Sequence, residues 1–180
     1  MEIMLRCELP DAPGSLALLA GTISEAGGDI QAVDVVETAE GRVLDDLLVV
    51  IDGERGATLL RALEALPEVT LVHAGPSRGH PGDAVTRLAV GLEALLDGQA
   101  PAERALTTLI GGMLRASAAE LVARGEAPQP SSKVLVLDVD ARVLVVRRDY
   151  RFTDTERERA AALLRLALLA EGARGHSATG

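Results

Sequence analysis

Two kinds of hydrophobic pattern follow one another in the first part of the chain. Over residues 2–9, every second residue is apolar (Ile3, Leu5, Cys7 and Leu9), and the residues between them are polar except Met4, which is typical of a strand with one buried face. Apolar residues then recur every three or four positions, at Leu16, Leu19 and Ile23, which predicts a helix. Pro and Gly between the two segments turn the chain. The pattern therefore predicts a strand, a tight turn and a helix.

The same patterns continue to residue 76 and define a fold class. The helix ends at a Gly-Gly pair, and the later apolar runs are separated by short turns rich in Gly and Glu. These runs predict a strand over 29–38, its hairpin partner over 42–52, a helix around 59–66 and a strand over 69–74. The resulting order, βαββαβ, predicts an α+β fold of the ferredoxin-like kind, in which two helices cover one face of a four-stranded antiparallel sheet.

The turn at residues 11–16, Asp-Ala-Pro-Gly-Ser-Leu, is the most informative segment of the chain. A turn that opens a helix leaves backbone N–H groups without acceptors, and such groups suit a small carboxylate or another anion. Simpler roles stay open. Asp11 has the right type to cap the helix, and Pro13 and Gly14 can serve turn geometry alone.

This turn and a second segment, Ala-Gly-Gly-Asp-Ile at residues 26–30, resemble the ACT domain, a small amino-acid-binding regulatory module. Residues 33–37 and the acidic pair Asp45-Asp46 are compatible but weaker signals. The resemblance implies that two modules pair side by side and hold an effector at their interface. It implies that the ligand-binding residues are Asp11, Ala12, Pro13, Gly14, Ser15, Leu16, Asp29 and Ile30. The family often has Asn where this chain has Asp29, and an acid there favours a ligand amino group and disfavours a second carboxylate.

Other polar and reactive residues of this part have ordinary interpretations. Asp34, Asp45 and Asp46 are expected on the solvent face or at the hairpin edge rather than as ligands. Cys7 lies on the inward face of its strand and is expected to behave as a small apolar residue. His73 and His80 have no second His or Cys at the spacing of a metal site, so no metal is expected.

Composition narrows the class of protein. Of 180 residues, 48% are hydrophobic, which supplies core material for one or two domains. The net charge of −9 argues against a nucleic-acid or membrane-surface binder, and one Phe, one Tyr and no Trp leave little for base stacking. A single cysteine fits a reducing compartment, and no leader or membrane-spanning apolar run is evident. We expect a cytoplasmic protein.

The second half predicts a separate, helix-rich α/β element. We expect an ACT-like domain over 1–76, a linker over 77–82, a second domain over 83–170 and a flexible tail over 171–180. Within the second domain, periodicity predicts helices over 83–97 and 102–124, a β-hairpin of strands 133–139 and 143–148, and a last helix that begins at a capping box and ends near residue 170. The Gly111-Gly112 pair either kinks the long helix or lets another backbone approach.

The stretch 145–157, a strand followed by F-T-x-x-E and a helix, is similar to the end of GAF-type sensory domains. That similarity implies a reduced GAF-like domain, and the alternative is a dimerisation or docking appendage without its own ligand. Arg147, Arg148 and Arg151 form a small basic cluster. Two interpretations stay open for it: a site for a phosphate or an acidic partner, or a solvated strand end.

No arrangement of residues typical of an enzyme is found. The sequence shows no nucleophile triad, no H-E-x-x-H and no phosphate-binding fingerprint after a strand. We therefore expect a regulatory, allosteric sensor that is not an enzyme, needs no cofactor and binds a small amino acid as a homodimer. The alternatives are a dimerisation or adaptor scaffold with a vestigial site, or a regulatory subunit of a separate metabolic enzyme.

Overall fold

The computed structural model describes residues 1–77, 84–97 and 102–177, and the chain divides into two compact units, residues 1–83 and 84–180. Each unit has its own hydrophobic core. The expected linker over 77–82 lies, apart from its first residue, outside the described residues, as does His80.

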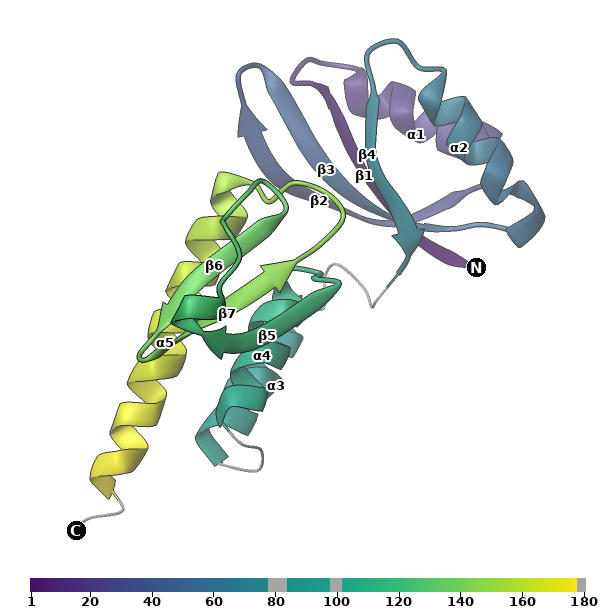
Figure 1. The fold of residues 1–180 in the computed structure, drawn as a ribbon. Coiled ribbons are helices and arrows are strands. Elements are labelled where there is room, and N and C mark those ends of the chain that lie inside the picture. Colours follow the sequence, from purple (N-terminus) through teal and green to yellow (C-terminus); the bar gives the residue numbers. More distant parts are fainter. Residues whose placement is uncertain (78–83, 98–101, 178–180) are drawn as a thin grey trace. The chain divides into compact units, whose positions relative to one another are not determined.

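The N-terminal unit has the predicted ferredoxin-like fold. Its elements are β1 (Glu2–Pro10), α1 (Ser15–Glu25), β2 (Asp29–Ala39), β3 (Arg42–Val50), the short 3-10 turn η1 (Gly53–Arg55), α2 (Gly56–Glu64) and β4 (Thr70–Pro76). The strands form one antiparallel sheet in the order β2-β3-β1-β4. Helices α1 and α2 lie together on one face of this sheet (Figure 1). The βαββαβ prediction is therefore confirmed.

The two faces of the sheet differ in what they carry. On the helix-covered face, alternate residues of β1 and β3 build the core with α1 and α2, among them Leu5, Cys7 and Leu47. Residues on the other face of these two strands, including Arg6 and Asp46, are also buried. The expectation that Asp45 and Asp46 lie on a solvent face or hairpin edge is wrong, because they are 2% and 3% exposed in the middle of β3. Asp34 is exposed, as expected.

The C-terminal unit is the expected helix-rich α/β element. It consists of α3 (Ala84–Asp97), α4 (Ala102–Met113), β5 (Ala118–Ala123), η3 (Arg124–Glu126), β6 (Val134–Val139), β7 (Arg142–Arg147) and α5 (Asp154–Ser177). The three helices contact one another and share a core with the sheet, whose order is β5-β7-β6 (Figure 1). The β6–β7 hairpin is confirmed.

One predicted element of this unit is wrong. The expected helix over 102–124 ends at Met113, and the rest of that segment forms β5. The chain leaves the helix through Arg115, whose φ is +51°, while the Ala116 N–H donates to the Gly111 carbonyl (2.9 Å) and the Arg115 N–H to that of Gly112 (3.2 Å). This is a Schellman end, which closes a helix even where the left-handed residue is not glycine. A Cβ on Gly111 would lie 2.9 Å from that of Ala119, so the glycine admits β5 close to α4.

The last helix is longer than expected. It continues to Ser177 instead of ending near residue 170, so most of the predicted tail is helical, and residues 178–180 lie outside the described part. In the stretches of chain that the structure describes, we find no helix with both the length and the apolar character needed to cross a membrane.

Candidate functional site

The turn between β1 and α1 has an open, strained geometry. Gly14 is the residue before the helix and adopts φ +95°, a left-handed conformation that favours glycine. A Cβ built on it would meet no atom within 4 Å, so the space beside it is open. No side chain caps the helix, and therefore the interpretation of Asp11 as its cap is wrong. The exposed Asp11 carboxylate makes no hydrogen bond within the described residues.

Some backbone N–H groups of this turn are bonded within the chain, and others are available to a ligand. Three are used locally: Asp11 N–H donates to Gly41 (2.9 Å), Ala12 N–H to Pro10 (2.9 Å) and Ser15 N–H to Ala12 (3.2 Å). The N–H groups of Gly14, Leu16 and Ala17 find no acceptor in the described part of the chain. They belong to the first turn of α1, where the helix dipole adds partial positive charge, so together they suit a carboxylate.

The second predicted segment, Asp29 and Ile30, lies far from this turn within one chain. Asp29 pairs with Val50 at the start of β2, level with Glu2, whereas the turn follows Pro10 at the other end of β1. Glu2 and Pro10 are eight residues apart along β1, so the start of β2 and the turn are separated by roughly 26 Å along the strand direction. Ile30 packs against the helix-side core, and the Asp29 carboxylate accepts a hydrogen bond from Gln31 Nε2. A single chain therefore does not bring the two predicted halves of the site together.

Asp45 is a residue that the sequence reasoning missed. It lies opposite Cys7 of β1 and Val35 of β2, on the helix-covered face and at the end of the sheet where residues 11–16 begin. Its side chain is buried, and Oδ1 has no hydrogen-bond partner among the described residues. Burial raises its pKa above the ordinary value of 3.8, and Asp46, Asp34 and Asp11 raise it further. Because Asp11 contributes, Asp45 lies within electrostatic range of the turn.

Asp45 also acts on its neighbour Cys7. Burial raises the pKa of the Cys7 thiol to about 12, and the charges of Asp45 and Asp46 add to this effect. A thiol with so high a pKa remains protonated at neutral pH and is a poor nucleophile. The geometry thus agrees with Cys7 as a small apolar residue of the core.

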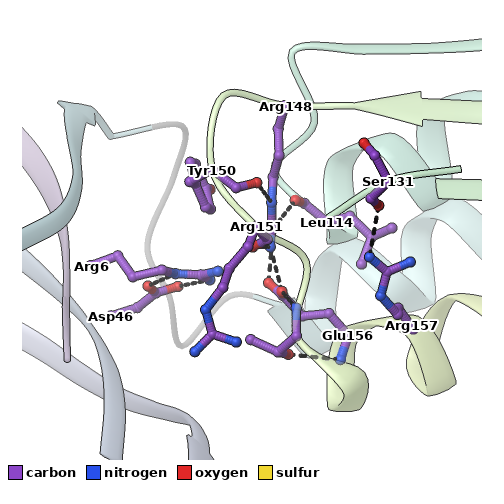
Figure 2. Close-up of polar contacts among 10 residues, drawn as sticks. Arg6, Asp46, Leu114, Ser131, Arg148, Tyr150, Arg151, Glu156 and Arg157 are labelled. Atoms are coloured by element: carbon purple, nitrogen blue, oxygen red, sulfur yellow. Dashed lines mark hydrogen bonds and ion pairs between the residues drawn. The ribbon is translucent and has the colours of Figure 1, made fainter. Parts of the chain in front are cut away.

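Asp46, the next residue of β3, is in the opposite situation. It faces the other side of the sheet and forms a bidentate pair with Arg6, from Nε to Oδ1 (2.7 Å) and from Nη2 to Oδ2 (2.9 Å), as Figure 2 shows. Both side chains are nearly inaccessible to water. Two adjacent aspartates of one strand are therefore both buried, but an arginine accompanies only Asp46.

Apolar side chains are exposed next to the turn and along β2. Leu16 of α1 is 43% exposed, and Val33 and Val35, on the helix side of β2, are 42% and 59% exposed. Strand β2 is an edge of the sheet and pairs only with β3 in this structure. An exposed edge with apolar side chains is a surface that another strand can cover.

Two of the three arginines in the predicted basic cluster, Arg147 and Arg148, are bonded to other residues of this unit. Arg148 is buried and donates to the carbonyls of Leu114 (2.9 Å), Tyr150 (3.2 Å) and Arg151 (2.5 Å) and to both carboxylate oxygens of Glu156. Its guanidinium stacks 4.2 Å from the ring centre of Tyr150 and 4.0 Å from that of Phe152. Arg147 pairs with Glu120. Both interpretations of this basic cluster are therefore wrong for Arg148, whose role is structural.

The F-T-x-x-E segment explains this arrangement. The Glu156 N–H donates to Thr153 Oγ1 (3.1 Å), and the Thr153 N–H donates to Glu156 Oε2 (2.9 Å), so the predicted capping box is present. The same Glu156 carboxylate holds Arg148 and ties the end of β7 to the start of α5. Among the described residues, no group of three His, Cys, Asp or Glu side chains is arranged to hold a metal ion.

Comparison with a known protein family agrees with this fold. The sequence model of the ACT domain matches residues 3–68, so the resemblance of the N-terminal unit to an ACT domain is confirmed. Similar solved structures include the ACT domain of a GTP pyrophosphokinase from Chlorobium tepidum (18% identity, 42% of this chain and 95% of that chain, TM-score 0.34). Another is the regulatory subunit of aspartate kinase from Thermus thermophilus (17% identity, 94% and 91% coverage, TM-score 0.35). No curated protein matches the sequence.

Proposed function

We propose that this protein is a non-enzymatic regulatory sensor whose N-terminal ACT domain binds a small amino acid between two copies of the chain. The observation that carries the proposal is the set of three N–H groups without acceptors at Gly14, Leu16 and Ala17, beside an open space. The ligand carboxylate accepts hydrogen bonds from these groups. An ACT domain over residues 3–68 supports a regulatory, ligand-binding role.

The distance between the two predicted halves of the site supports binding between two chains. Strand β2 runs from Asp29 to Ala39, and its free edge faces away from β3. If two such edges pair antiparallel about a two-fold axis near the middle of β2, the start of each strand lies beside the end of the other. The start of β2 in one copy then approaches residues 11–16 of the second copy, and a complete site forms only in the homodimer.

The exposed apolar side chains support the same pairing. Leu16, Val33 and Val35 flank the edge that pairs, and covering them removes apolar surface from water. Edge pairing also satisfies backbone groups of β2 that otherwise contact only water. A ligand held by both copies favours one dimer arrangement over another. Coupling of about 1–3 kcal/mol is typical of such a switch, and the C-terminal unit is its expected receiver.

A melting-temperature screen against the twenty amino acids tests the proposal. At a hundred times its dissociation constant, a ligand adds about 2.7 kcal/mol to the unfolding free energy, which appears as a clear rise in melting temperature. We expect a selective rise, together with a dimer in analytical ultracentrifugation. A dimer that responds to none of the twenty contradicts the proposal.

That last outcome favours the second candidate function, a dimerisation or adaptor scaffold with a vestigial site. The specific observation behind it is the exposed apolar edge of β2, which supports pairing whether or not a ligand is bound. In the scaffold, Val35→Glu disrupts the dimer and nothing else. In the sensor, the same variant also abolishes ligand binding, because the site is shared between two chains.

A further inference from the structure

Asp45 has no structural role comparable to that of its neighbour. A buried ionised carboxylate without a partner is unfavourable by several kcal/mol in an apolar setting, so proteins pair or neutralise such groups. Asp46 is paired with Arg6 on the other face of the sheet. Asp45 Oδ1 has no partner among the described residues, although the side chain is only 2% exposed. Among the described residues, no Lys, Arg or His forms an ion pair with Asp45.

The position of Asp45 places it close to the candidate site. Asp45 pairs with Cys7 of β1, and Cys7 lies three residues before Pro10, where β1 ends and the turn begins. On the other side of Asp45 is Val35, which is 59% exposed on the same face. Strand β2, whose outer edge is free, thus lies one strand spacing, about 4.8 Å, from the Asp45 strand. Asp11, in the turn itself, is near enough to raise the pKa of Asp45.

The charges that shift the pKa of Asp45 all have one sign. The groups that raise the pKa of Asp45 are Asp46 on its own strand, Asp34 on β2 and Asp11 in the turn, and the Cys7 thiol opposite it is protonated. A cationic group is attracted to such a place, and a second carboxylate is repelled from it. The three N–H groups of the turn attract an anion at the same end of the sheet. An anion site beside a cation site matches the two ends of an α-amino acid.

We propose that the Asp45 carboxylate accepts the ammonium group of the bound amino acid and makes the site selective for amino acids without a second carboxylate. This inference rests on the proposed function and deepens it. Asp29, the acid first expected near the amino group, is at the other end of the sheet within one chain. Asp45 therefore provides an acceptor from the same copy that supplies the turn.

Binding also moves a proton in this scheme. An ammonium group beside Asp45 stabilises the ionised carboxylate and lowers its pKa, so ligand binding releases protons at pH values between the pKa of the bound state and that of the free state. Affinity then decreases as the pH falls. Calorimetry in buffers of different ionisation enthalpy measures this proton release directly.

The test is isothermal titration of the full chain with two matched pairs of probes, L-glutamine against L-glutamate and L-asparagine against L-aspartate, and with the other sixteen amino acids. Asp45→Asn keeps the shape of the side chain and removes its charge. Glu64→Gln is the matched control, because it makes the same change of net charge at an exposed residue at the end of α2, which is not among the acids that shift the pKa of Asp45.

We expect binding of an amino acid without a second carboxylate, and amides that bind more tightly than the corresponding acids. Asp45→Asn should weaken binding roughly ten- to hundredfold, the usual loss for a hydrogen bond to a charged group, while Glu64→Gln changes it less than about twofold. A melting curve of Asp45→Asn verifies that the variant is folded.

The outcomes separate this inference from the proposed function. If an amino acid binds the natural chain and Asp45→Asn equally well, or if L-glutamate or L-aspartate binds best, the role of Asp45 is wrong and the sensor function stands. If no amino acid binds the natural chain, both proposals are overturned.

Discussion

The molecule buries charge in two contrasting ways, one in each unit. In the C-terminal unit, Arg148 makes five hydrogen bonds and stacks on two aromatic rings, so each polar atom of its guanidinium is used. In the N-terminal unit, Asp45 is equally inaccessible, and its Oδ1 has no partner in the described chain. The difference teaches where to look for function. A fully bonded buried charge fixes the fold, whereas one without a partner invites a ligand.

The largest expected effect comes from breaking the bonded cluster. Glu156→Ala removes the carboxylate that holds Arg148 and also half of the capping box. The arginine is left buried without a counter-charge, so we expect a loss of about 3–5 kcal/mol in unfolding free energy, measured by urea denaturation. Glu158→Ala, an exposed change on the same helix, is the control. A loss below about 1 kcal/mol for Glu156→Ala contradicts the structural role of Arg148.

A somewhat smaller effect is expected for Asp46→Asn. This variant leaves Arg6 buried beside a neutral amide in place of a carboxylate. We expect a loss of about 3 kcal/mol, at the lower end for a broken buried pair, because the amide still offers one acceptor. Ligand binding should persist, since Asp46 lies on the face of the sheet away from the helices. Denaturation and titration of the same sample measure both properties.

Asp45→Asn should change stability in the opposite direction. The pKa of Asp45 is raised in the folded state, so the neutral form is favoured there. The resulting contribution to stability is fully present below the ordinary carboxyl pKa and is lost as the pH rises through the folded pKa. The variant, which is neutral at every pH, should therefore match the stability of the natural chain in acid and exceed it at pH 8.

Urea denaturation at a series of pH values measures this difference. Equal stability of the two chains at pH 8 would show that Asp45 finds a partner in solution. A variant that is more stable but no longer binds is the pattern expected where stability is given up for function.

Some parts of the fold and of the candidate site can be predicted from the sequence, and others cannot. The βαββαβ order and the turn at residues 11–16 follow from local periodicity and turn chemistry, so they were predictable. The end of α4 was not, because Leu121 stays in phase with the helical pattern and a non-glycine residue, Arg115, closes the helix. Burial of Asp46 depends on Arg6, forty residues away in the chain.

One signal in the sequence does point to Asp45 and Asp46. They are flanked by Leu44 and Leu47, which point to opposite faces of β3. Apolar residues on both faces are typical of a strand that is buried on both sides. Reading each aspartate alone, as a residue type that is usually exposed, hides this pattern. The roles of Asp29 and Ile30, the GAF-like similarity of residues 145–157 and the expected domain boundaries stay predictions.

A small effect on stability, but a full loss of binding, is expected for Gly14→Val. A side chain at φ +95° costs about 1–2 kcal/mol, and this one fills the open space beside the free N–H groups. Gly41→Val is the matched control, because Gly41 also has a positive φ (+73°) and no atom within 4 Å of its added Cβ. Titration should show binding in the control only, and both variants should remain dimers. Unchanged ligand affinity in Gly14→Val would show that the turn is not part of the binding site.

The most direct test of the central claim is a two-dimensional ¹⁵N–¹H NMR titration of the full chain with the amino acid that raises its melting temperature most. If the ligand carboxylate is held by the first turn of α1, the amide signals of Gly14, Leu16 and Ala17 shift most and move downfield as their hydrogen bonds form. The Gly41 amide, outside the proposed contacts, should move little. Saturating ligand that leaves the three amides unmoved, or that shifts only signals of the C-terminal unit, contradicts the account.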